Sequence, residues 1–168
     1  IPSQYGALAY DVKIGDRILL DDGNLELLVE SVDREDVTCR VVHGGALGDH
    51  KGMNLPGVDI SAPSLTKKDR EDAYFALKMG VDFLALSFVR RVSDIEALRA
   101  LISETHSRVA IVGKIEKPEA LDNIDEILDA ADAIMVARGD LGVEMSPEKV
   151  PLLQKHAIES ANLQGKLV

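Results

Sequence analysis

Apolar strand-like runs and amphipathic helix patterns alternate regularly from Thr66 to the end of the chain. Three nearly continuous apolar runs, 81–88, 109–112 and 133–137, predict parallel strands buried on both faces, since such strands show no polar alternation. Apolar residues at helical spacing fill the intervals between these runs. The repeated pattern predicts an α/β fold with a parallel sheet, either closed into a barrel or open and doubly wound.

Local signals set the expected limits of the helices. Thr66 has the spacing of a capping box with the aspartate three residues later, and Gly80 is expected to end that helix. Ser93 begins a second capping-box pattern. Pro118 suits the first position of a third helix, and Ser146 precedes a proline that is expected to open a last one.

The first part of the chain has a different pattern. Residues 8–43 read as strands and tight turns, with strand-like segments at 17–20, 25–32 and 37–42. A glycine-rich stretch, 44–57, is expected to link this small antiparallel β unit to the βα repeats.

Composition narrows the classes of function. The chain is 46% hydrophobic, so it can bury a core, and its formal net charge of −10 gives no electrostatic reason to bind nucleic acid or an anionic membrane. Cys39 is the only cysteine and is expected to be a reduced strand residue. We find no signal peptide and no membrane-spanning run, and therefore expect a cytoplasmic protein. The chain begins at Ile1 and ends where a new strand begins at 166–168, so we expect it to be a truncated piece.

Polar residues follow each of the three predicted strands, where functional groups of βα proteins gather. Ser87 and Arg90 can bind a phosphate or carboxylate, or can belong to a helix approach and a surface ion pair. Lys114 and Glu116 alternate onto one face of their strand and can serve an anion and a metal together, or form a structural ion pair.

The third strand leads into a glycine-bracketed aspartate. Gly139 and Gly142 allow the backbone to approach a ligand closely, while Asp140 either binds Mg²⁺ or caps a helix. With Glu116 it gives two carboxylates on adjacent strand ends, a set that suits Mg²⁺ and an anionic substrate. Lys51 lies among glycines and can contact phosphate, although an interdomain loop is the favoured interpretation.

Together these segments resemble pyruvate kinase, over nearly the whole chain and in the same order. The block from Ile134 to Gly142 is highly specific, whereas any other segment alone is weak. The matching segments are Gly15-Asp16 to Leu20-Asp21-Asp22-Gly23, Lys51 to Gly57, Lys68-Asp69, Ser87 to Arg90, Lys114-Ile115-Glu116, Asp125 to Leu128, Ile134 to Gly142, Glu148-Lys149-Val150 and Gly165-Lys166.

The resemblance implies a partial (β/α)₈ TIM barrel with a small β-rich inserted lid domain. Residues 1–59 would be the C-terminal part of the lid domain, and 60–168 the central portion of the barrel. The implied reaction transfers the phosphoryl group of phosphoenolpyruvate to ADP, giving pyruvate and ATP. Mg²⁺ or Mn²⁺ is implied as cofactor, with K⁺ in the full-length enzyme, which is expected to be a homotetramer.

The resemblance also implies roles for single residues. Lys114 matches the lysine that stabilises the phosphoryl transition state and the enolate, and Glu116 and Asp140 match the metal ligands. The backbone amides of Gly139 and Asp140 match those that hold the substrate carboxylate. Ser87 and Arg138 match further substrate-binding positions, and Lys51 matches a lid lysine near the nucleotide phosphates.

The chain departs from the family pattern in a few places. Leu86, Gly113 and Lys117-Pro118 differ from the usual residues. The first barrel strands, with the K⁺ site and a substrate-binding arginine, do not occur in this sequence, nor does the threonine expected just beyond Val168. We therefore expect the isolated chain to be inactive, or nearly so. Two other interpretations remain open: a Mg²⁺-dependent barrel lyase or aldolase acting on pyruvate-like substrates, and a non-catalytic binding fragment.

Overall fold

The computed structural model describes residues 1–168, which form two compact units, Ile1–Ala62 and Pro63–Val168. The division falls close to the boundary expected between residues 59 and 60. That the first unit is part of the family's lid domain stays a prediction. None of the helices is both long and apolar enough to cross a lipid bilayer.

The first unit is built on a four-stranded antiparallel sheet with strand order β3-β2-β1-β4. The three strands predicted in this region are confirmed, and they bury one side against a small apolar core. The elements are α1 (Leu8–Asp11), β1 (Arg17–Leu20), β2 (Leu25–Asp33), β3 (Asp36–His43) and β4 (Met53–Asn54).

Two expectations for the first unit are wrong. The strand region does not begin at residue 8, because Leu8–Asp11 forms the short helix α1. The Asp11 carboxylate holds this helix by accepting a 2.9 Å hydrogen bond from the N–H of Ser61, a residue far along the chain. The glycine-rich stretch is not only a linker, since it contains β4, which pairs with β1 through Leu20 and Met53.

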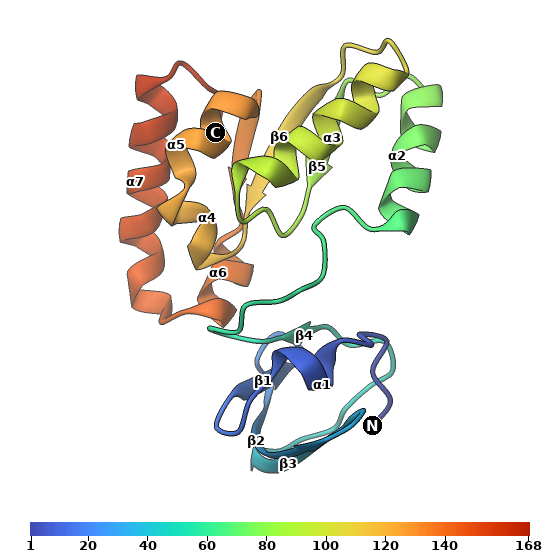
Figure 1. The fold of residues 1–168 in the computed structure, drawn as a ribbon. Coiled ribbons are helices and arrows are strands. Elements are labelled where there is room, and N and C mark those ends of the chain that lie inside the picture. The colour runs from blue at the N-terminus through green and yellow to red at the C-terminus, as the bar shows by residue number, and fades with distance from the viewer. The chain divides into compact units, whose positions relative to one another are not determined.

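The second unit contains a three-stranded parallel sheet with order β5-β6-β7 (Figure 1). The expected α/β class is confirmed. The three strands form part of a barrel, and the sheet does not close on itself. The elements are α2 (Lys67–Lys78), β5 (Phe83–Leu86), α3 (Val92–Glu104), β6 (Ala110–Ile115), α4 (Pro118–Asp122), α5 (Ile124–Ala130), β7 (Ala133–Val136), α6 (Arg138–Glu144), a 3₁₀ turn η1 (Pro147–Lys149) and α7 (Val150–Leu163).

The helices cover only one face of the parallel sheet. Residues of β6 alternate between buried and half-buried, with Gly113 on the buried side. A side chain at Gly113 would meet Ile95 of α3 and Ile127 of α5, so these helices pack on that face. On the opposite face Phe83 is 58% exposed. The expectation that the strands are buried on both faces is therefore wrong, because no helix or further strand of the second unit covers the second face.

The predicted capping box at the start of α2 is confirmed. The Asp69 carboxylate accepts a 2.8 Å hydrogen bond from the N–H of Thr66, and the Thr66 hydroxyl accepts one of 3.2 Å from the N–H of Asp69. The box predicted at Ser93 is wrong, because Ser93 already lies inside α3. Asp94, in the first turn of α3, caps the start of the helix in its place and accepts a 2.9 Å hydrogen bond from the N–H of Arg90.

The helix predicted after Pro118 is two short helices, α4 and α5, which meet at Asn123. Its side-chain amide donates 2.9 Å hydrogen bonds to the carbonyl oxygens of Glu119, four residues earlier, and of Arg90, far along the chain. These contacts fix the break. The helix predicted from Ser146 begins as η1 before α7. The strand expected at 166–168 is present as a single parallel bridge between Leu167 and Ala133.

Asp132 joins three segments at the amino-terminal edge of the sheet. Its carboxylate accepts hydrogen bonds of 2.7 Å from the N–H of Ile111 and 2.8 Å from the Arg99 guanidinium. Burial opposes the ionisation of Asp132, but these two hydrogen bonds and the positive charge of Arg99 outweigh it and lower the pKa of the carboxyl. The ionised carboxylate therefore stabilises the folded chain.

We expect Asp132→Asn to destabilise the protein near neutral pH. A carboxyl with a lowered folded pKa contributes stability above its unfolded value of about 3.9 and loses that contribution as the pH falls through the folded pKa. The urea midpoints of wild type and variant should therefore differ at pH 6 and converge below about pH 4. Asp129→Asn, at an exposed position, is the control. If the difference in urea midpoint between wild type and Asp132→Asn stays constant with pH, the stabilisation does not come from the ionised carboxylate.

Candidate active site

The carboxyl ends of the three parallel strands lie at one edge of the sheet, and the register sets which residues become neighbours. Leu86 of β5 pairs with Gly113 of β6, so Ser87 lies beside Lys114. Ile115 of β6 pairs with Val136 of β7. The predicted polar residues therefore emerge at the same edge, on consecutive strands.

Lys114 is held between two neighbours at this edge. Its Nζ donates a 2.9 Å hydrogen bond to the Ser87 Oγ and forms an ion pair with Oε1 of Glu116. By strand alternation Lys114 lies on the sheet face that the helices leave uncovered. The structure thus brings Ser87, Lys114 and Glu116 together, with the Lys114 side chain partly accessible and the Glu116 side chain buried.

Phe88 contributes to the cluster through its backbone, which the sequence does not reveal. Its N–H donates a 2.9 Å hydrogen bond to Oε2 of Glu116, and its carbonyl accepts one of 2.9 Å from the Ser64 hydroxyl. Phe88 adopts a φ of 55°, which is uncommon for a residue other than glycine. A phenylalanine carries no sequence signal for this conformation, so neither Phe88 nor Ser64 was predicted.

The glycine-bracketed segment after β7 is a short helix, α6, rather than a loop. Its start is fixed beside β6 by a 3.1 Å hydrogen bond from the N–H of Ala137 to the carbonyl of Ile115, the residue before Glu116. Asp140 lies in the first turn with an exposed side chain and does not cap the helix. A side chain added at Gly139 would meet no atom within 4 Å, so the space beside this turn is open.

The remaining predicted residues lie on other elements. Arg138 is the exposed first residue of α6. Lys51 belongs to the first unit, where its ammonium forms a 2.8 Å ion pair with Asp21. The hydrogen bond between these side chains raises the pKa of Lys51 and lowers that of Asp21, so both stay charged over a wide pH range.

The two carboxylates expected to bind a metal, Glu116 and Asp140, are oxygen donors of the kind that suits a hard divalent cation. No group of three or more Asp, Glu, His or Cys side chains gathers to hold a metal through the protein alone. Mg²⁺ typically takes one or two carboxylates and completes its shell with other oxygens. Glu116 and Asp140 supply that number, and each oxygen of Glu116 has a second lone pair beyond the one used by Lys114 or Phe88.

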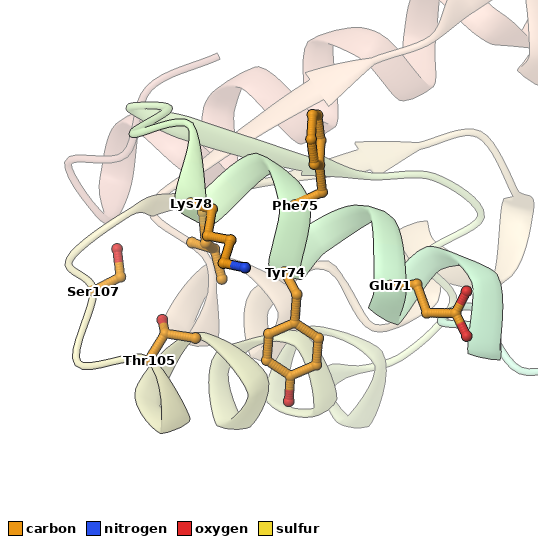
Figure 2. Close-up of a pocket in the computed structure, with 7 residues that line it drawn as sticks. Glu71, Tyr74, Phe75, Lys78, Thr105 and Ser107 are labelled. Carbon is orange, nitrogen blue, oxygen red and sulfur yellow. The ribbon is translucent and has the colours of Figure 1, made fainter.

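A cavity of about 710 Å³ in the second unit lies between α2 and the segment after α3, and its lining includes none of these residues. Figure 2 shows Phe75 pointing away from Tyr74 and Lys78, so the side chains around it do not converge on one point. The Tyr74 hydroxyl donates a hydrogen bond to Glu104, which raises the pKa of Tyr74. This arrangement gives no set of groups aimed at a ligand.

Comparisons with known proteins point to one family. A family model described as the barrel domain of pyruvate kinase matches residues 1–168. The pyruvate kinase of Mycobacterium tuberculosis is 49% identical over 168 residues, covering 100% of this chain and 36% of that protein. That of Corynebacterium glutamicum is 51% identical over 168 residues, covering 100% and 35%. That of Staphylococcus aureus is 48% identical over 166 residues, covering 98% and 28%. The chain spans about a third of the length of the curated relatives that it matches.

Proposed function

This chain belongs to the pyruvate kinase family, and from that premise we propose that the whole protein transfers the phosphoryl group of phosphoenolpyruvate to ADP, giving pyruvate and ATP. The observation that carries the proposal is the Lys114 ammonium held by Ser87 and Glu116 at the carboxyl edge of the sheet, next to the start of α6. The family match favours this reaction over a barrel lyase or a non-catalytic fragment.

Phosphoryl transfer needs positive charge near oxygens that become more negative. As the bond between the enol oxygen and phosphorus breaks, charge spreads over the phosphoryl oxygens and the departing enolate. A lysine fixed in advance stabilises that charge without reorganising during the reaction. Lys114 suits this role because its partners hold it in place while its side chain stays partly accessible.

We assign the cation to Glu116 and Asp140, with Mg²⁺ or Mn²⁺ as the ion. When bound, such a cation acts as a Lewis acid that neutralises charge on substrate oxygens. The backbone N–H groups of Gly139 and Asp140 lie in the first turn of α6, where helical N–H groups have no intrahelical acceptor and can hold a substrate carboxylate. Arg138 and Ser87 are proposed to contact substrate as well, and Lys51 the nucleotide phosphates.

Other features of the proposal rest on the resemblance alone. We propose that the whole enzyme uses K⁺, forms a homotetramer and acts in the cytoplasm. A coupled assay with lactate dehydrogenase on the full-length protein tests the reaction, with the 168-residue chain alone expected to be inactive. Pyruvate must form only when both ADP and a divalent cation are present. Pyruvate formed without nucleotide would instead support a lyase.

Gly139→Ala should impair substrate binding without harming the fold. An added methyl meets no atom of the chain, and alanine favours a helix over glycine by up to about 1 kcal/mol, so stability should hold or rise slightly. If a substrate carboxylate approaches this backbone, the methyl occupies its space, and we expect KM for phosphoenolpyruvate to rise about tenfold, the loss of roughly 1.4 kcal/mol.

Gly142→Ala is the matched control, since it lies in the same helix and an added methyl there also meets no atom. Steady-state kinetics and thermal unfolding should separate the two variants. Equal KM values for Gly139→Ala and wild type would remove Gly139 from the substrate site.

A further inference from the structure

Lys117 and Glu144 form an ion pair that is almost completely removed from solvent. Their Nζ and Oε1 atoms lie 2.6 Å apart, and the side chains are 6% and 2% exposed. The pair of Lys68 and Asp72, by contrast, is 78% and 63% exposed. Transferring two charges from water into a protein interior costs free energy that their attraction often fails to recover. Stability alone is therefore a weak explanation for this pair.

The location of the pair suggests another role. Lys117 directly follows Glu116, the proposed cation ligand, at the end of β6. Glu144 is the last residue of α6, whose first turn carries Gly139 and Asp140. The ion pair therefore joins the segment that holds one proposed cation ligand to the helix that holds the other.

Helix α6 needs external support to keep one position. It has seven residues, two of them glycines, and isolated helices of this length are unstable. Its start is fixed by the hydrogen bond from Ala137 to Ile115, and its middle by Leu141, which is fully buried in the core. The Lys117–Glu144 pair fixes its other end. Without this pair the last turn of α6 loses its buried ionic link to the end of β6, and we expect the helix to shift relative to that strand.

We propose that the Lys117–Glu144 pair positions α6, and with it Gly139 and Asp140, against the end of β6. Lys117 and Glu144 are positioning residues rather than catalytic ones, and the inference rests on the proposed function of the site. Groups that orient metal ligands typically change metal affinity or activity by about 10- to 100-fold when they are removed. A small displacement of Asp140 is therefore expected to weaken cation binding even when the fold is intact.

The test uses the full-length protein with both charges removed, in the double variant Lys117→Met/Glu144→Leu. Replacing both partners removes the two buried charges of the pair together, so we expect the melting temperature to stay near that of wild type. Mn²⁺ affinity, measured from the electron paramagnetic resonance signal of free Mn²⁺ without substrates, should fall about tenfold. In the coupled assay kcat should also fall about tenfold, while KM for ADP should not change.

Glu144→Gln is measured beside it, because the amide keeps the length of the side chain and an acceptor oxygen for Lys117. It should retain more Mn²⁺ affinity than the double variant. If the double variant does not fold, the Mn²⁺ affinities of Glu144→Gln and Glu144→Leu are compared instead, at a temperature below the melting temperature of both. Glu144→Leu should then bind Mn²⁺ more weakly than Glu144→Gln, and equal affinities would overturn the proposal. Lys68→Met, which breaks the exposed pair with Asp72, is the control and should match wild type in every measurement.

A folded double variant with wild-type Mn²⁺ affinity would overturn the proposal and leave the pair a purely structural one. Mn²⁺ binding is read without turnover, so it does not depend on the reaction. A wild-type protein that binds Mn²⁺ but forms no pyruvate would count against the proposed function alone. Loss of Mn²⁺ affinity in the double variant would then still support the positioning of Asp140.

Discussion

Lys114→Met in the full-length protein should lower kcat for pyruvate formation by about 10³-fold. Removing one fixed group that stabilises transition-state charge typically costs 10²- to 10³-fold, and Lys114 is the only cation that the structure holds within the Ser87–Glu116 cluster. Methionine is an unbranched side chain one atom shorter than lysine, and it removes the charge and its hydrogen bonds. The coupled assay measures the effect, with KM for ADP expected to change little.

The stability of Lys114→Met must be measured with its activity. The variant leaves the buried Glu116 carboxylate with only the N–H of Phe88, and removing one partner of a buried pair costs about 3 kcal/mol. Urea unfolding shows whether the assayed protein is folded. Ser87→Ala keeps the ion pair and loses the 2.9 Å hydrogen bond, so kcat should fall only about tenfold. A folded Lys114→Met variant within tenfold of wild-type kcat would disprove the role of Lys114.

Glu116→Gln should weaken Mn²⁺ binding by about 100-fold or more. The amide oxygen of glutamine can still accept the hydrogen bond from Phe88, so the local backbone should persist. The negative charge that a hard cation requires is lost, and removal of a direct ligand costs at least as much affinity as removal of a group that orients one. Equilibrium binding of Mn²⁺ in the absence of substrates measures the change.

Asp122→Asn is a suitable control for Glu116→Gln. The substitution also removes one negative charge, and Asp122 is exposed on the neighbouring helix α4. It should leave Mn²⁺ affinity unchanged. If Glu116→Gln also binds Mn²⁺ as wild type does, the cation belongs elsewhere and the assignment to Glu116 and Asp140 fails.

The elements predictable from the sequence are those fixed by neighbours in the chain. Thr66 and Asp69 form a capping box within one turn, so their spacing is sufficient to predict it. The strands β1, β2, β3, β5, β6 and β7 follow from local apolar runs and turns, whereas β4 does not. Two-residue spacing predicted that Lys114 and Glu116 lie near each other, and they form an ion pair. Parallel strands bring their carboxyl ends to one edge, so the sequence is sufficient to predict which polar residues gather there.

Features set by distant contacts were not predictable in the same way. The break at Asn123 depends on the carbonyl of Arg90, and the ion pair of Lys117 depends on Glu144, 27 residues away. Sequence spacing also cannot show that Phe88 adopts a positive φ to present its N–H to Glu116. In each case the partner is chosen by packing of the whole unit rather than by any local pattern.

The two edges of the parallel sheet hold different groups of polar residues. Asp132 and Arg99 join segments at the edge where the strands begin, whereas Lys114 and Glu116 lie at the edge where β6 ends. Substitutions around Asp132 are therefore expected to change the thermal stability of this unit without moving Lys114 and Glu116.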